Sequence, residues 1–212
     1  FYELMYYNHN IHFLAVSRAM EGRYAEAILA AAKVDSHAVA AAPSMPFLEG
    51  FAITEPLVMV RSYRWYDVLE LPKPDTSLRL ITAFWHYSRA LALIGLGRID
   101  ETKTEQAEYF AATKIVSPDA YVGAWNSAGE VFRITDNVLA GQIAWADGDR
   151  DGSIAHLERA VEAQDSLNYD EPEGWYIPAR ETLGAKLLLK KDLAAAEQVF
   201  RTELEKHPRN GR

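Results

Sequence analysis

A short phrase recurs along this chain between stretches of helical pattern. Its clearest form is Gly-Arg-Tyr-Ala-Glu-Ala-Ile at 22–28, and weaker forms stand at 64–69, 97–102, 148–153 and 191–196. In each form a glycine or basic residue ends one helical pattern, and an acidic or small pair begins the next. Recurrence of this kind is the sequence signature of stacked helix pairs. The phrase therefore predicts an all-α helical-repeat fold, which is typical of binding scaffolds rather than of conventional enzymes.

The turn residues of these phrases divide the chain into about five helix pairs. They are Gly22, Arg64, Gly97, Gly148 and Lys191, which lie 42, 33, 51 and 43 positions apart. We expect one irregular α-solenoid over residues 1–212, a right-handed superhelix whose loops account for the unequal spacing. Its units are predicted at about 6–34, 47–71, 77–114, 128–166 and 178–206. The stretch 117–128 is expected to hold an additional turn, and no β-strand is predicted anywhere.

The composition of the chain excludes some classes of binding partner. The net charge is −8 and no cluster of Lys and Arg offsets it, which argues against nucleic acid. The chain has no cysteine, so neither disulfides nor thiolate metal sites are available. No apolar run reaches the length of a membrane span, and no membrane insertion is expected. These features leave the compartment undetermined, with a bacterial cytoplasm preferred to a periplasm.

The two ends of the chain suggest a piece of a longer array. The chain begins at Phe1 without a Met, and 207–211 resembles the link into a further repeat. Helical-repeat proteins need polar capping units for solubility. Self-association through uncapped ends is therefore a further expectation.

The last helix pair matches a known repeat pattern best, through Leu183, Gly184, Leu187, Ala196 and Phe200, followed by Pro208. On this pattern the chain resembles tetratricopeptide repeat (TPR) proteins over nearly all its length. Three phrases, at 7–14, 85–87 and 169–180, make it most similar to a poorly characterised group of bacterial TPR proteins. The resemblance implies a concave groove lined by the first helix of each pair. It also implies a missing upstream repeat that carries a His-Met-Pro-Ser-His phrase in such relatives.

Aligned on the turn at Gly22, the resemblance places His9 and His12 at groove-facing positions one helical turn apart. It brings Trp85, His86 and Tyr87 to the groove in the third unit. Two imidazoles at this spacing can share Zn²⁺ or Cu²⁺, or can hold a carboxylate by hydrogen bonds. The alternative is that both histidines cap the solenoid or contact the missing upstream repeat.

The phrase Glu-Pro-Glu-Gly-Trp-Tyr-Ile-Pro-Ala-Arg at 171–180 is the stronger candidate for a binding site. Two prolines restrict its backbone, and Trp175 offers a face for stacking or for a cation–π contact. Arg180 can hold a carboxylate with both nitrogens of its guanidinium, either on a ligand or on Glu171. The alternative is structural: an ion pair between Glu171 and Arg180 fixes the last helix pair, and Trp175 fills the gap between units.

These observations lead to two hypotheses. The first is a scaffold that binds a protein or peptide segment in its groove, without catalysis and without a cofactor, since the common enzyme motifs are missing. The second is a small-ligand or metal site, which could also be catalytic, with a divalent metal such as zinc. That site would be built from His9, His12, His86, Glu171 and Arg180.

Overall fold

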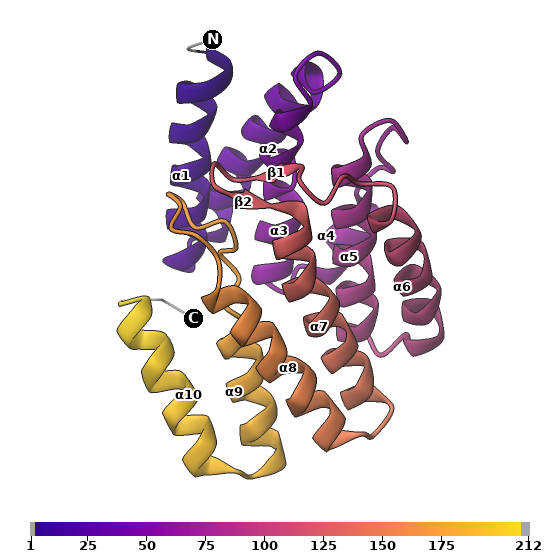
Figure 1. Cartoon of the computed structure of the whole chain (residues 1–212), viewed down its shortest axis with the longest axis vertical. Helices are drawn as coiled ribbons and strands as arrows, with labels where there is room; N and C mark the ends of the chain where they lie inside the picture. Colours follow the sequence, from indigo (N-terminus) through magenta and orange to yellow (C-terminus); the bar gives the residue numbers. More distant parts are fainter. Residues whose placement is uncertain (1–2, 209–212) are drawn as a thin grey trace.

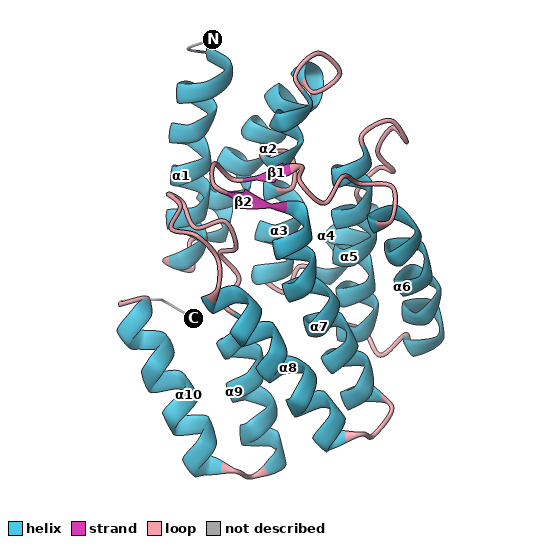
Figure 2. Cartoon of the chain, in the orientation of Figure 1, coloured by secondary structure: helices cyan, strands magenta, loops and turns pink. Residues whose placement is uncertain are grey.

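The computed structural model describes residues 3–208, and the prediction of an all-α fold is confirmed over them (Figures 1 and 2). A π-helical turn, η1 (Glu3–Tyr7), and a 3₁₀ segment, η2 (Pro46–Gly50), accompany the α-helices. The α-helices within this range are α1 (Asn8–Met20), α2 (Tyr24–Ala41), α3 (Thr54–Arg61), α4 (Trp65–Glu70), α5 (Arg79–Gly95), α6 (Ile99–Thr113), α7 (Ala128–Ala146), α8 (Arg150–Asp165), α9 (Ala179–Lys190) and α10 (Leu193–Lys206).

The helices pack in adjacent pairs, from α1 with α2 to α9 with α10. Figure 1 shows successive pairs side by side, with the first and last pairs both at the left of the molecule. His12 of α1 contacts Tyr176 of the loop that precedes α9, so segments far apart in the sequence meet. Residues 209–212, which hold most of the expected link into a further repeat, lie outside the described residues.

The same turn joins the two helices of every pair. After the first helix, one residue takes a positive φ, and the next N–H donates to the carbonyl five positions earlier at 2.8–3.0 Å. This is the Schellman arrangement that ends helices, and it favours glycine because glycine has no Cβ. The positive-φ residues are Gly22, Tyr63, Gly97, Gly148 and Lys191. Four of these are the predicted turn residues, and in the second pair Tyr63 takes this place instead of Arg64.

The residue after each turn stabilises the start of the second helix. In the first three pairs it is an arginine that pairs with an acid three positions later, and in the last two it is an aspartate whose carboxylate accepts a backbone N–H of the first turn. The ion pairs are Arg23–Glu26, Arg64–Asp67 and Arg98–Glu101, and the capping aspartates are Asp149 and Asp192. The recurring phrase thus encodes one local structure five times.

One element contradicts the sequence prediction. The stretch expected to hold only a turn forms a short antiparallel hairpin of β1 (Tyr121–Val122) and β2 (Asn126–Ser127). Strands of two residues are too short to show an alternating apolar pattern. The run 56–60, which is apolar enough for a strand, lies in α3 as predicted.

The hydrophobic core continues from pair to pair and includes the long loop 166–178. Trp175 and Tyr176 of that loop are buried in the same cluster as Phe84 and Tyr87 of α5. This burial holds the loop against α5. Among the helices of residues 3–208, none is both long and apolar enough to cross a bilayer.

Candidate functional site

A cavity of about 580 Å³ lies beside α1, and we refer to it as the aromatic cavity. Four separate segments line it: the start of the chain through α1, the η2 region, the β1–β2 hairpin and the loop 166–178. Figure 1 shows the hairpin and this loop close to α1. The principal side chains of its wall are those of Tyr6, His9, His12, Phe47, Phe51, Tyr121, Trp125 and Glu171.

The carboxylate of Asp170 holds the hairpin in place at this cavity. Its Oδ2 accepts the backbone N–H of Ala124 at 2.7 Å and that of Trp125 at 3.3 Å. The hairpin turns at Gly123, where φ is +76° and a Cβ would lie 2.2 Å from the same oxygen. The turn therefore requires glycine. Because the hairpin is tied to the loop in this way, the two form one wall.

Much of the aromatic surface here is open to solvent. The side chain of Trp125 is 70% exposed, and Tyr6, Phe47 and Tyr121 are also exposed. An isolated apolar side chain on a surface is ordinary, but a continuous patch around a cavity marks an interaction site. Tyrosine and tryptophan suit such a role because each offers a large apolar area and few rotatable bonds.

His12 belongs to the apolar wall. It is 8% exposed and lies edge to face against Phe51, with ring centroids 5.5 Å apart. Burial, together with the neighbouring His9, lowers the pKa of His12 to about 4. The imidazole is therefore neutral at neutral pH. His9 is partly exposed at the same cavity and stacks edge to face on Phe13 at 5.9 Å.

The structure brings His9, His12 and Glu171 to one cavity, although 162 positions separate His9 from Glu171. Within residues 3–208, no group of three or more His, Asp or Glu side chains is arranged to hold a metal ion. Three of the five residues in the second hypothesis therefore share one cavity. Metal binding by these residues stays a prediction.

Glu171 and Arg180 do not pair with each other. The guanidinium of Arg180 instead binds Asp165 with both nitrogens, one of them at 2.8 Å, and Lys206 shares that carboxylate at 2.7 Å. Glu171 accepts a hydrogen bond from the hydroxyl of Tyr169. The predicted pair of Glu171 with Arg180 is wrong because Asp165, at the end of α8, lies closer to the start of α9.

Trp175 has no exposed face. It is buried against Phe84 and Tyr87, with ring centroids 6.1 and 6.0 Å away. The expectation of an open stacking surface on Trp175 is therefore wrong, because its indole packs within the core against α5. Trp175 also lines a second cavity together with Tyr87.

Trp85 and His86 both contact other residues of the protein. The indole of Trp85 donates to the carbonyl of Leu71 at 3.2 Å and lies under the guanidinium of Arg89. His86 Nδ1 lies 2.6 Å from a carboxylate oxygen of Glu105. His86 is thus separated from His9, His12 and Glu171, and the five side chains of the second hypothesis do not form one site.

Sequence reasoning missed Phe47, Tyr121 and Trp125. One signal was available: the interval of 51 residues between Gly97 and Gly148 is the longest, and it holds the phrase Tyr-Val-Gly-Ala-Trp at 121–125. Aromatic side chains around a glycine in an insertion indicate a structured loop rather than a simple linker.

A comparison of the chain with models of protein families, with curated proteins and with solved structures finds no match.

Proposed function

We propose that this chain is a TPR-like helical-repeat scaffold that binds a protein or peptide segment, and that the aromatic cavity anchors an apolar side chain of that segment. The observation that carries the proposal is the exposed aromatic wall around this cavity, with Trp125 at its rim. Interfaces are commonly anchored by a few aromatic side chains that lose their contact with water on binding.

Separate observations support the proposal that the chain is a helical-repeat scaffold. Five helix pairs use one turn geometry, which is the behaviour of a repeated unit rather than of an unrelated set of helices. A second cavity is lined mainly by α3, α5, α7 and α9, the first helices of four successive pairs, with Trp65 of α4 and the loop 166–178 completing its wall. A right-handed superhelix with an inner binding surface is consistent with both observations.

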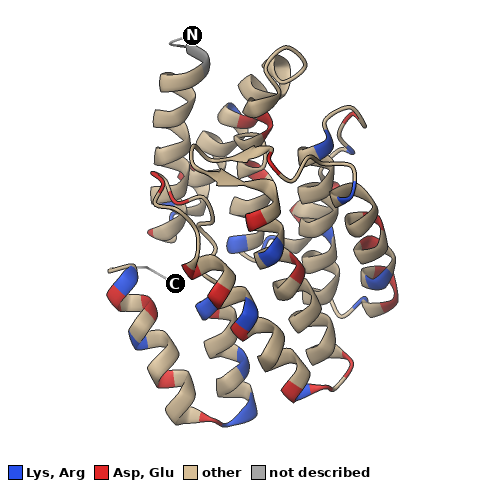
Figure 3. Ribbon diagram, viewed as in Figure 1, with Lys and Arg blue, Asp and Glu red and all other residues tan. Residues whose placement is uncertain are grey.

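The charge around the aromatic cavity favours a segment with a basic residue beside its apolar anchor. The loop 166–178 carries three acidic residues and neither Lys nor Arg, and the same bases are absent from 117–128 (Figure 3). Among the described residues, Glu171 makes no ion pair. A lysine or arginine that approaches the cavity would meet an acidic rim, which adds specificity and a faster association rate.

The test uses short random peptides displayed on phage, selected on the protein and then synthesised. The Trp125→Ala variant should bind a selected peptide about tenfold more weakly, because truncation of an aromatic anchor commonly costs more than 1 kcal/mol. Glu171→Gln should weaken binding about threefold and reduce its dependence on salt. Tyr66→Ala is the matched control, since Tyr66 is an equally exposed aromatic on α4 away from the cavity.

Equal binding to the wild type and to the Trp125 and Glu171 variants would place the peptide elsewhere and refute this assignment of the cavity. Failure to select any peptide above background would argue against peptide binding itself.

A small-ligand or metal site is the second candidate, favoured by the meeting of His9, His12 and Glu171 in one cavity. Metal analysis of the untagged protein tests it, with a variant that carries both His9→Ala and His12→Ala. One tightly bound ion per chain that is lost in the variant would establish a metal site. A result without metal would leave peptide binding as the function to pursue.

A further inference from the structure

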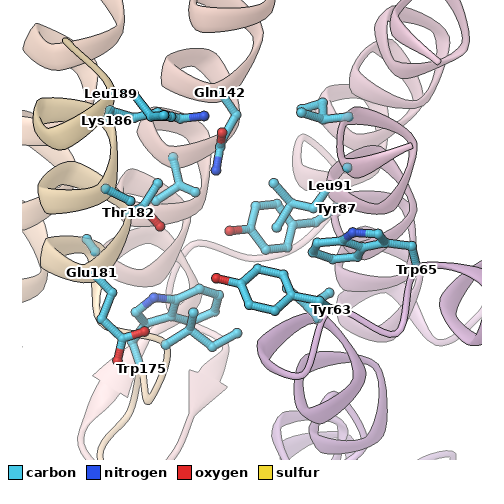
Figure 4. A pocket seen from close by; sticks show the side chains of 17 residues that line it. Tyr63, Trp65, Tyr87, Leu91, Gln142, Trp175, Glu181, Thr182, Lys186 and Leu189 are labelled. Carbon is cyan, nitrogen blue, oxygen red and sulfur yellow. The ribbon is translucent and has the colours of Figure 1, made fainter. Parts of the chain in front are cut away.

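A second cavity, of about 290 Å³, lies on the inner side of the helices and shares no lining residue with the aromatic cavity. We refer to it as the inner cavity. Figure 4 shows aromatic side chains of one half of the chain, Tyr63, Trp65 and Tyr87, facing α7 and α9 of the other half across it. Its volume is at the lower end of the range for small-molecule sites.

The phenol of Tyr87 is a buried donor that points into this cavity. The residue is 1% exposed, and Figure 4 shows its oxygen directed into the space between the helices. Within residues 3–208 the hydroxyl has no hydrogen-bond partner; the neighbouring phenol of Tyr109 uses Thr135 and Asp136 instead. Burial and the nearby Asp136 raise the pKa of Tyr87, so the phenol keeps its proton.

The indole of Trp175 adds a second donor in the same wall. Its Nε1 is also buried without a hydrogen-bond partner among the described residues. A buried donor that bonds to nothing is costly, and the few such groups in native proteins commonly mark a bound water or ligand. Together with the phenol of Tyr87 in the same cavity, this indole indicates that an oxygen-bearing molecule belongs there.

The ammonium group of Lys186 lies at the opposite end of the inner cavity. Figure 4 shows Lys186 of α9 and Gln142 of α7 entering it from that end. The ammonium group of Lys186 lies 5.0 Å from the ring centre of Trp145, and no carboxylate of the described residues pairs with it. Burial and the nearby Arg150 lower the pKa of Lys186 to about 8. At neutral pH most of these ammonium groups are still charged and would gain from an anionic partner.

We propose that the inner cavity binds a small carboxylic acid with an apolar body and a second oxygen acceptor. The carboxylate pairs with Lys186 and accepts a hydrogen bond from the amide of Gln142. The apolar body lies against the aromatic wall, and the second oxygen accepts the hydrogen of the Tyr87 phenol. Lys186, Gln142 and Tyr87 then each have a partner of matching chemistry, while the carboxylate of Glu181, which also lines the cavity, is paired with Arg61.

Three related compounds test each part of this proposal. 3-Benzoylpropionate carries the carboxylate, the ring and a ketone; its primary amide lacks the charge, and 4-phenylbutyrate lacks the ketone. The readout is the indole ¹⁵N–¹H signal of Trp175. The chain has five tryptophans, so substitution of each of the other four by phenylalanine assigns this signal as the one that every variant retains.

The keto acid should shift the Trp175 signal and bind about tenfold more tightly than its amide. Lys186→Met should remove that preference, because it keeps an apolar stem and loses the charge. Lys190→Met is the matched control: Lys190 lies one turn further along α9, is exposed and pairs with Asp151. Tyr87→Phe should abolish the preference for the keto acid over 4-phenylbutyrate.

Equal binding of acid and amide, or an unchanged preference in Lys186→Met, would overturn the proposal. A Trp175 signal that no compound shifts would also overturn it and would leave bound water as the partner of both donors. Thermal unfolding of each variant establishes that a lost preference does not come from a lost fold.

Discussion

The phenol of Tyr176 donates a hydrogen bond to the backbone carbonyl of Thr54 at 3.3 Å, across 122 positions of the chain. This bond ties the loop 166–178 to the start of α3. The loop is thereby held where Glu171 reaches the aromatic cavity and Trp175 reaches the inner cavity. A single contact between distant segments thus helps to position both candidate sites.

Tyr176→Phe should lower the free energy of unfolding by about 1 kcal/mol, because the buried carbonyl of Thr54 loses its donor while the ring still packs. The midpoint of urea unfolding measures this change. Tyr66→Phe is the control, since Tyr66 is exposed and its hydroxyl makes no hydrogen bond within the described part of the chain. An equal effect of both substitutions would show that the bond contributes nothing specific.

Arg61 connects three helices. Its Nε donates to the carbonyl of Ala19 at the end of α1, and its terminal nitrogens lie 3.4 Å from the carboxylate of Glu181 on α9. Both side chains are largely buried, and removal of one partner from a buried ion pair is strongly destabilising. Arg61→Met should therefore cost about 3 kcal/mol in urea unfolding.

A matched substitution is Arg98→Met, because Arg98 forms an exposed ion pair with Glu101 inside a single turn. Exposed pairs contribute little, so its unfolding midpoint should change only slightly. A similar small change for Arg61→Met would mean that the contact between α3 and α9 does not stabilise the fold.

The burial of His12 predicts a dependence of stability on pH. The pKa of this imidazole falls from 6.5 to about 4 on folding, so between these values the unfolded chain binds more protons than the folded one. Stability is therefore complete above pH 6.5 and is lost as the pH falls toward 4, by up to about 3 kcal/mol.

Urea unfolding across this pH range gives the measurement. His12→Phe should remove the dependence, because phenylalanine fits beside Phe51 and does not titrate. His9→Ala should largely keep it, since the neighbouring His9 is the smaller cause of the shift. A slope that persists unchanged in His12→Phe would assign it to other groups.

Gly184 lies where α9 crosses α10. A Cβ at this position would lie 2.6 Å from the ring of Phe200, so the helices are closer here than alanine allows. Gly184→Ala should destabilise the protein by about 1–3 kcal/mol through overpacking. In a Phe200→Ala background the same change should instead stabilise by about 1 kcal/mol, because alanine is the better helix former. The thermodynamic cycle of the four proteins measures this coupling, and additive effects would show that no close contact exists.

The local structure was largely predictable from the sequence. The recurring phrase located four of the five positive-φ residues that join the helices of each pair. These features depend on neighbours within a few positions, because helix ends are determined by φ preferences and by capping side chains. The two strands were not predicted from the sequence, because their hairpin is held by hydrogen bonds to Asp170, more than 40 positions away.

The composition of the sites depended on tertiary structure. The chemistry of His9, His12, Glu171, Trp175 and Arg180 was visible in the sequence, but their partners were not. The packing of the folded chain brings Glu171 to the cavity of His9, places Arg180 beside Asp165 and buries Trp175 beside Tyr87. Residue types and their local spacing thus determined the helices and turns by themselves. The fold alone decided which side chains meet and which donors stay unpaired, because burial and long-range contact depend on the packing of the whole chain.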